Sequence, residues 1–153
     1  MKISKRIVFF LSVFFIIINI VAAFHAYKFT HFIEGNGQLT QWPKKLSGLE
    51  KIKALVFGVS NYKPENDTYP TNPYSTIDLL TKDGVLKVWE TKVDSSKGVV
   101  IVLHGYPGQK SSMIDRAVYF NSIGYSTLIL GFRGCGDSFG YQTTISFHEE
   151  NDV

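Results

Sequence analysis

The stretch V-V-I-V-L-H-G-Y-P-G, residues 99–108, decides the fold. Its first five residues form a continuous apolar run, rich in β-branched side chains, which is typical of a strand buried on both faces within a parallel sheet. The next five bring a histidine, two glycines and a proline directly after that strand. Glycines let the backbone turn sharply and present N–H groups to an incoming oxygen. The stretch therefore predicts a strand of an open α/β sheet that leads into a ligand-binding loop.

The residues that follow predict a helix and a second strand. Ser112 and Asp115 have the spacing of a helix start, residues 113–120 supply an apolar stripe, and Gly124 marks the helix end. Residues 125–130 then form an apolar strand. Strand, helix and strand within about 35 residues make a βαβ unit, whose crossover is expected to be right-handed.

The residues before this unit predict a β-hairpin. Two partly alternating runs, residues 76–79 and 85–89, flank the turn signal Lys82-Asp83-Gly84. The preceding segment, residues 62–74, carries three prolines among Asn, Asp and Thr, so it is expected to be a loop.

An almost unbroken apolar run occupies Ile7–Phe24, after three basic residues within the first six positions. The run is long enough to span a bilayer, and a membrane anchor is the favoured interpretation. The alternative is a secretory signal peptide, for which Val21-Ala22-Ala23 offers the small residues before a cut. Because Lys28 is the only Lys or Arg between the run and Lys44, the positive-inside rule places the N-terminus in the cytoplasm. The remainder is then exported, to the periplasm or outside the cell, and is secreted if the signal is cut.

A short amphipathic helix is predicted after residue 47. Ser47 and Glu50 have the S-x-x-E spacing of a capping box, and apolar residues follow at helical spacing as far as Val59. The favoured interpretation is that this helix packs on its own domain. The lysines around it leave a second one open, in which the helix lies on an anionic bilayer: Lys44, Lys45, Lys51 and Lys53.

Composition excludes several classes of function. The net charge is +3, and the lysines are scattered, with no basic stripe that would suggest a nucleic-acid partner. The single cysteine, Cys135, cannot form an internal disulfide. The four histidines are dispersed and show no metal-ligand spacing. No metal, cofactor or nucleic acid is therefore expected.

The string Gly136-Asp-Ser-Phe-Gly140 fits G-x-S-x-G, the pattern of a nucleophile elbow, and raises Ser138 as a candidate. An elbow needs a strand that runs directly into the turn, whereas here the strand ends near Leu130. The expected order Ser, acid, His also fails, because only His148 followed by Asp152 comes after the serine. Ser138 is therefore predicted to be a loop hydroxyl that bonds nearby backbone.

Three segments together resemble the first half of an α/β-hydrolase: residues 99–108, G-Y-S-T-L-I-L-G-F-R-G-C-G-D-S-F-G at 124–140, and T-T-I-S-F-H-E-E-N-D-V at 143–153. The likeness is greatest to exported bacterial members of the serine aminopeptidase or monoacylglycerol lipase type. It covers nearly the whole chain, and residues 98–153 are its specific part. It departs from the family at Gly131, where relatives usually carry Asp, and at Cys135, where His is common.

The resemblance implies a fold and a set of residue roles. The fold is the N-terminal part of an α/β-hydrolase sheet, an antiparallel hairpin followed by a βαβ unit, after an N-terminal transmembrane helix. The backbone N–H of Tyr106 would be one oxyanion-hole donor, and His104 would shape the loop that Gly105, Pro107 and Gly108 complete. The loop after the fourth strand would be structural: Arg133, Gly134, Gly136 and Ser138. The family's nucleophile follows the fifth strand, and Asp152 would lie where the helix before that strand begins, so no catalytic triad is expected here.

Three regions are expected: 1–27, a basic start with a membrane anchor or uncleaved signal; 28–75, a juxtamembrane helix and a Pro/Asn-rich loop; and 76–153, the N-terminal half of a hydrolase domain. The full-length form would be a serine hydrolase of the esterase, lipase or aminopeptidase type. It would act on ester, thioester or amide bonds of a small-molecule or peptide acyl substrate. The present chain is expected to be a fragment or prematurely terminated copy that is inactive alone. The alternative is a non-catalytic, membrane-tethered α/β binding module.

Overall fold

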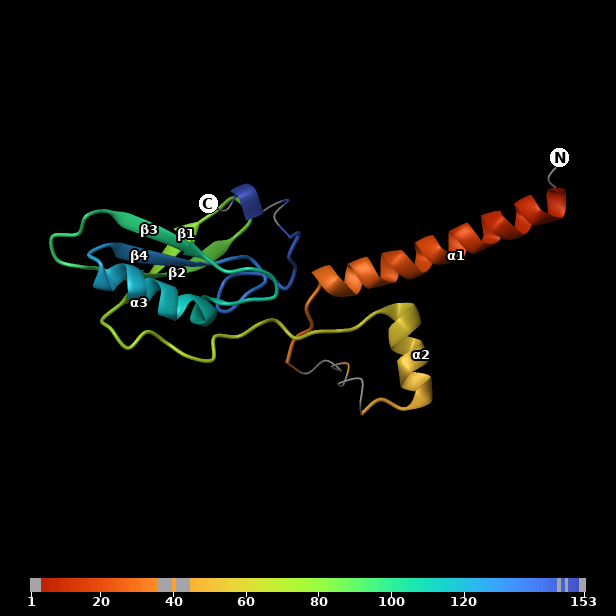
Figure 1. Cartoon of the computed structure of the whole chain (residues 1–153), viewed down its shortest axis with the longest axis horizontal. Coiled ribbons are helices and arrows are strands. Elements are labelled where there is room, and N and C mark those ends of the chain that lie inside the picture. The colour runs from red at the N-terminus through yellow and green to blue at the C-terminus, as the bar shows by residue number, and fades with distance from the viewer. Residues whose placement is uncertain (1–3, 36–39, 41–44, 146, 148, 152–153) are drawn as a thin grey trace. The chain divides into compact units, whose positions relative to one another are not determined.

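The computed structural model describes residues 4–35, 40, 45–145, 147 and 149–151. The chain divides into two compact units, Met1–Tyr62 and Lys63–Val153. The first unit contains two helices, α1 (Lys5–Thr30) and α2 (Gly48–Phe57), and the second contains a four-stranded sheet with the helix α3 (Ile114–Ser122) (Figure 1).

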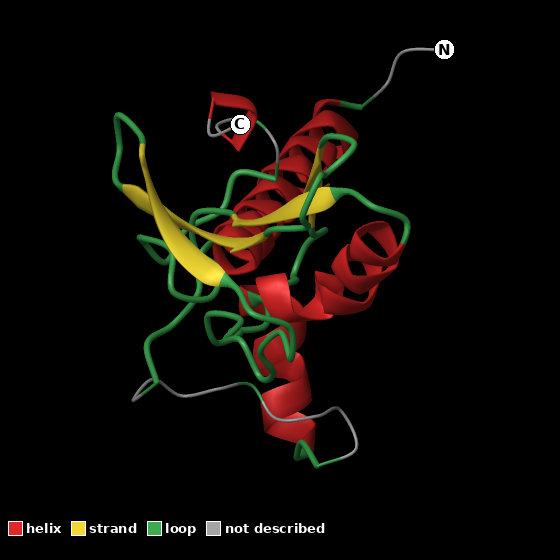
Figure 2. Ribbon diagram, turned by 90° about the vertical axis from the view of Figure 1, so that its left-hand side faces the viewer, coloured by secondary structure: helices red, strands yellow, loops and turns green. Residues whose placement is uncertain are grey.

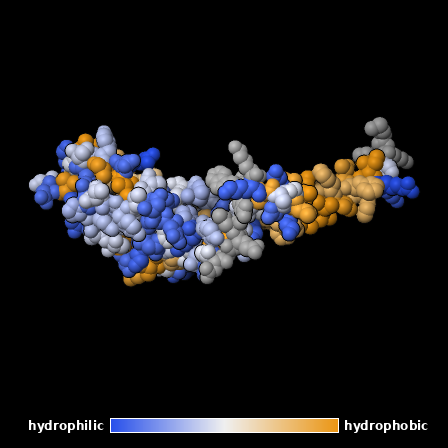
Figure 3. Space-filling view, turned by 90° about the horizontal axis from the view of Figure 1, so that it is seen from below, coloured by the Kyte–Doolittle hydropathy of each residue, from blue (hydrophilic) through white to orange (hydrophobic). Residues whose placement is uncertain are grey.

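Helix α1, Lys5–Thr30, confirms the predicted apolar helix. It buries none of its residues, and apolar side chains cover most of the face of the helix that Figure 3 shows. Its polar side chains bond within the helix: Ser12 Oγ donates to the Val8 carbonyl at 2.9 Å, and Asn19 Nδ2 donates to the Phe15 carbonyl at 2.8 Å. Among the described residues it is the one helix long and apolar enough to cross a membrane.

Helix α2, Gly48–Phe57, begins at the predicted capping box. The Glu50 carboxylate accepts from the Ser47 N–H at 2.8 Å, and the Ser47 hydroxyl accepts from the Glu50 N–H at 3.4 Å. The helix packs against α1, where the rings of Phe57 and Phe24 meet edge-to-face with centroids 5.2 Å apart. Its predicted apolar stripe is not what makes this contact, since Leu49 and Ile52 are exposed.

The sheet has the order β1-β2-β4-β3. Strands β1, Ser75–Leu80, and β2, Val85–Thr91, form the predicted antiparallel hairpin. Strand β3, Val99–Leu103, pairs in parallel with β4, Ser126–Gly131, which is antiparallel to β2. The strands twist along their length (Figure 2), as sheets of L-residues do.

A short 3₁₀ turn, η1, at Lys110–Met113 and helix α3, Ile114–Ser122, connect β3 to β4 and complete the predicted βαβ unit. A second 3₁₀ turn, η2, covers Glu149–Asn151. Each face of the sheet carries a small apolar core. On the α3 side, Ala117 packs with three sheet residues: Trp89, Val102 and Ile129. On the other side, Leu86, Val88 and Leu130 pack beside Phe132 and Phe139.

Two predictions about this unit are wrong in detail. Strand β3 is not buried on both faces, because β4 is its only partner strand among the described residues and Val99 and Ile101 are 62% and 54% exposed. Ser112 does not cap α3. It lies within η1, and its hydroxyl donates back to the Gln109 carbonyl at 2.7 Å.

Candidate active site

The loop His104–Gly108 lies at the carboxyl end of β3, just before η1. Its turn is closed by the Gly108 N–H, which donates to the Gly105 carbonyl at 2.7 Å. Because β3 and β4 are parallel, the carboxyl ends of both strands reach the same edge of the sheet. The segment that follows β4 therefore meets this loop, as the contact between the rings of His104 and Phe132 shows.

His104 holds the two segments together. It is buried, and its two ring nitrogens lie 3.1 Å from the Gly105 carbonyl oxygen and 3.3 Å from the Phe132 nitrogen. A carbonyl can only accept and an N–H can only donate, so Nδ1 carries the proton and Nε2 accepts. Burial lowers the pKa of His104, and nearby Lys110 lowers it further, whereas the bond to Gly105 raises it. The two hydrogen bonds require a neutral ring, and they fix the ring between the loop and the segment after β4.

A cavity of about 110 Å³ opens between the two segments. The predicted loop lines it through His104, Gly105 and Tyr106, and the opposite wall includes Phe132, Cys135, Thr143 and Glu149. The sequence predicts Tyr106 at this edge of the sheet, but it does not indicate Glu149. The Glu149 carboxylate accepts hydrogen bonds from the Thr143 hydroxyl at 2.9 Å and from the Thr144 N–H at 2.8 Å.

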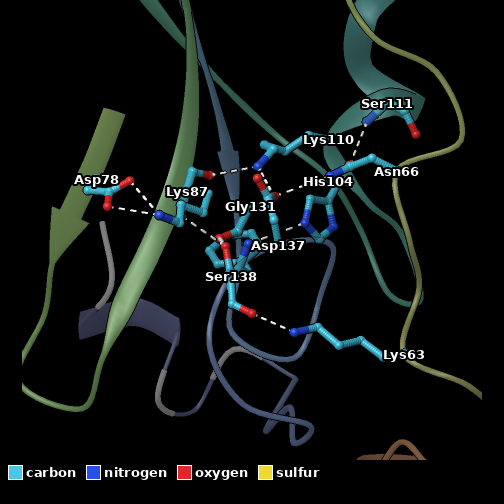
Figure 4. Close-up of polar contacts among 11 residues, drawn as sticks. Lys63, Asn66, Asp78, Lys87, His104, Lys110, Ser111, Gly131, Asp137 and Ser138 are labelled. Atoms are coloured by element: carbon cyan, nitrogen blue, oxygen red, sulfur yellow. Dashed lines mark hydrogen bonds and ion pairs between the residues drawn. The ribbon is translucent and has the colours of Figure 1, made fainter. Parts of the chain in front are cut away.

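Two side chains near the cavity could in principle act as nucleophiles, but both are buried. Cys135 is 4% exposed, and burial raises the pKa of its thiol to about 11, which nearby Lys63 only partly offsets. The thiol is therefore protonated at neutral pH and a poor nucleophile. Ser138 is 2% exposed, and its hydroxyl donates to the Gly131 carbonyl at 2.5 Å and accepts from the Lys87 N–H at 3.0 Å (Figure 4).

Ser138 thereby connects β2 to the end of β4, and it stands seven residues beyond Gly131, the last residue of that strand. The strand does not run directly into it, as a nucleophile elbow would require.

No family model and no curated protein matches the sequence. Among solved structures, an esterase from Pyrococcus furiosus, Pf2001, is similar at 28% identity, with a TM-score of 0.51, over 59% of this chain and 38% of that one. An alpha-beta serine hydrolase homologue from Coxiella burnetii is similar at 23% identity, with a TM-score of 0.35, over 50% of this chain and 40% of that one. The sheet has the α/β-hydrolase fold. The chain spans well under half the length of both solved proteins.

In this α/β-hydrolase sheet the segment after β4 is a tightly packed loop. Gly134 has φ +71°, and a Cβ there would lie 2.8 Å from the Gln142 carbonyl oxygen. The Arg133 guanidinium pairs with the Asp83 carboxylate at 3.1 Å. Gly136 donates its N–H to the Pro64 carbonyl at 2.6 Å. These contacts link the loop to the β1–β2 turn and to the segment before β1, and the structural roles that the resemblance implies stay a prediction.

The sequence did not indicate the ion pair that lies under this loop (Figure 4). Lys110 is 1% exposed, and its ammonium contacts the Asp137 carboxylate, donates to the Lys87 carbonyl at 3.2 Å and lies 4.9 Å from the centroid of the Trp89 ring. The two charged residues are 27 positions apart, beyond the reach of any local pattern. His148 and Asp152, the other polar residues singled out in the sequence, lie outside the described residues.

The loop His104–Gly108 offers a matched pair of glycines for a stability test. A Cβ at Gly108 would lie 2.6 Å from the Gly105 carbonyl oxygen, whereas a Cβ at Gly105 meets nothing within 4 Å. Gly108→Ala should lower the free energy of unfolding by about 1–3 kcal/mol, and Gly105→Ala should change it by less than about 1 kcal/mol. Urea unfolding of the full chain in detergent measures both. Equal effects would show that the turn is not as tight as described.

Glu149 predicts a dependence of stability on acid. Burial would raise its pKa, but hydrogen bonds from Thr144 and Thr143 lower it to about 2 from an ordinary 4.5. A carboxylate with a lowered folded-state pKa stabilises the fold above its unfolded pKa, and the stabilisation is lost as the pH falls towards the folded value. Lowering the pH from about 5 to about 2 should lower the urea concentration at the unfolding midpoint, and Glu149→Gln should flatten this pH dependence. An unchanged slope in the variant would assign the acid sensitivity to other groups.

Proposed function

We propose that Lys63–Val153 supplies the oxyanion-hole part of a serine hydrolase that acts on ester, thioester or amide bonds. The observation that carries the proposal is the position of the loop His104–Gly108, which ends a parallel strand and lines a cavity in a sheet of the α/β-hydrolase fold. The similarity to an esterase agrees with an acyl substrate, either a small molecule or a peptide.

The chemistry of acyl transfer explains what such a loop does. A serine attacks the carbonyl carbon, a histidine takes the serine proton, and the carbonyl oxygen becomes an oxyanion. Backbone N–H groups that face this oxygen stabilise its charge in the transition state. We assign the N–H of Tyr106 as one donor, and the residue after the nucleophile as the other. His104, with both ring nitrogens bonded, holds the loop in place and is not the base.

The nucleophile is not assigned to either candidate near the cavity. The hydroxyl of Ser138 is occupied between two strands, and the thiol of Cys135 is protonated. We therefore expect the chain alone not to turn over substrate, and the reacting serine to come from outside the described residues.

Fluorophosphonate labelling tests this assignment in two steps. The purified full chain should remain unlabelled at Ser138, and a label on that residue would overturn the assignment. Membranes of the source cell, treated with the same probe and precipitated with an antibody to the chain, should yield a labelled serine that follows a strand. In that assembly Tyr106→Pro, which removes the N–H, should slow labelling by about 10²–10³-fold.

One observation favours a second candidate, a non-catalytic binding module. The charged Glu149 carboxylate lines the same cavity, where it would oppose a developing oxyanion and favour a cationic group. A complete absence of labelled serine in the precipitate, together with binding of a small amine that Glu149→Gln abolishes, would support this candidate.

We also propose that α1 anchors the chain in a membrane, with the N-terminus in the cytoplasm and the second unit exported. Its length, the mean hydropathy of 2.9 over its most apolar 18-residue window and the basic residues at its start support this. A tag at residue 1 should stay on the membrane-bound protein and resist protease added from outside the cell. Loss of the tag from the mature protein would show a cleaved signal peptide instead.

A further inference from the structure

Helix α2 separates apolar and charged residues around its axis. At about 100° per residue, one arc of the helix carries four apolar residues: Leu49, Ile52, Leu55 and Val56. Lys51 and Lys53 fall on the two flanks of this arc, and Phe57 falls on the far side. Lysines on both edges of an apolar arc are typical of helices that lie in a membrane interface.

Three of the four arc residues are exposed, and Val56 is half-buried. Leu49, Ile52 and Leu55 are 74%, 60% and 72% exposed. The helix is instead attached to α1 by other groups: the Phe57 ring packs on Phe24, and the Leu55 carbonyl oxygen lies 2.8 Å from His25 Nε2. Most of the apolar arc is thus exposed to solvent, although the helix is fixed to α1.

The attachment lies at a defined level of α1. The apolar run Ile7–Phe24 has a helical length of about 27 Å, close to the thickness of a hydrocarbon core of about 30 Å. Phe24 and His25 therefore lie where α1 leaves the hydrocarbon. At this level α2 runs crosswise to α1 (Figures 1 and 2), which is the direction of the membrane plane if α1 spans.

We infer that α2 lies in the interface of the membrane that α1 crosses, with its apolar arc among the lipid chains and its flanking lysines at anionic headgroups. The inference rests on the proposed anchoring by α1. Lys45, which is exposed shortly before α2 in the chain, adds a third positive charge. The arc and the lysines together match a bilayer that contains anionic lipid, because both apolar burial and charge attraction strengthen such binding.

Single cysteines labelled with nitrobenzoxadiazole in the full chain test the inference. The test position is Ile52→Cys, on the arc, and the matched control is Lys51→Cys, its exposed neighbour on the flank. Phe15→Cys, in the middle of α1, reports on the anchor itself. Cys135 stays in place because it is buried, and the chain without an added cysteine gives the background labelling.

The chains are reconstituted in vesicles of phosphatidylcholine and phosphatidylglycerol in equal parts, with a nitroxide on the acyl chains as quencher. Quenching at position 52 should exceed that at position 51 by about twofold or more, since only the arc enters the hydrocarbon. In phosphatidylcholine alone the quenching at position 52 should weaken, and an equal value there would overturn the role of the lysines.

The label at position 15 separates the two possible failures. If it is not quenched, α1 does not span and the anchor proposal fails, taking the inference with it. If it is quenched but positions 51 and 52 behave alike, only the inference is overturned. If neither the lipid nitroxide nor aqueous iodide quenches the label at position 52, the inference is also overturned, because the arc is then covered by protein.

Discussion

Ser138→Ala is expected to lower the free energy of unfolding of the second unit by about 2–4 kcal/mol. The substitution leaves the buried carbonyl of Gly131 and the N–H of Lys87 without the hydroxyl that now satisfies both. Each buried group that loses its partner costs about 1–3 kcal/mol. Urea unfolding of the full chain in detergent, followed by the fluorescence of buried Trp89, measures the change.

Ser112→Ala is the matched control for this variant. Ser112 is exposed, and its hydroxyl donates to the local Gln109 carbonyl. Its removal should change the free energy of unfolding by less than about 0.5 kcal/mol. If Ser138→Ala were as mild as the control, the hydroxyl of Ser138 would not be a structural link, and a chemical role for it would have to be reconsidered.

Asp137→Asn is expected to lower the free energy of unfolding by about 2–3 kcal/mol, because it leaves the buried ammonium of Lys110 without a counter-charge. The loss stays below that of a fully buried pair because the Asp137 side chain is 45% exposed. Lys110→Met should cost less, about 1 kcal/mol, since methionine fills the space over Trp89 and the remaining carboxylate can reach water. Unfolding in urea of both single variants and the double variant gives the coupling between the two residues.

The same pair has a pH signature. Burial alone would raise the pKa of Asp137, but the hydrogen bond and charge of Lys110 lower it below its ordinary value. Its stabilising contribution is therefore present above the unfolded pKa of a carboxyl group and is lost as the pH falls through the folded value. Lys110→Met should weaken this acid dependence.

If Asp137→Asn and Lys110→Met lowered the free energy of unfolding by the same amount, burial of the lysine would not be the dominant contribution.

The elements of the fold could be predicted because each depends on residues close together in the chain. The run Ile7–Phe24, the capping box at Ser47 and the turn at Lys82-Asp83-Gly84 are local patterns, and each forms the element that its pattern predicts. The exposure of β3 could not be predicted in this way, because burial of a strand depends on which strands lie beside it. An apolar sequence is the same in a central strand and in an edge strand.

The candidate site shows the same division. The loop His104–Gly108 could be predicted, since glycines directly after an apolar strand mark the carboxyl edge of a parallel sheet. Glu149 in the cavity wall and Lys110 under Asp137 could not, since each is placed by partners distant in sequence or by an irregular segment. Lysine is almost never fully buried without a partner, and the partner becomes visible only in the folded chain.

The exposed edge of β3 affects how the protein behaves in solution. Within the described part of the chain, the outer row of backbone N–H and C=O groups of β3 has no partner strand, and with Val99 and Ile101 beside it this row is a template for pairing with another extended chain. Aggregation should therefore increase with protein concentration at temperatures well below the one at which the sheet unfolds. At high expression levels the chains should form assemblies joined strand to strand.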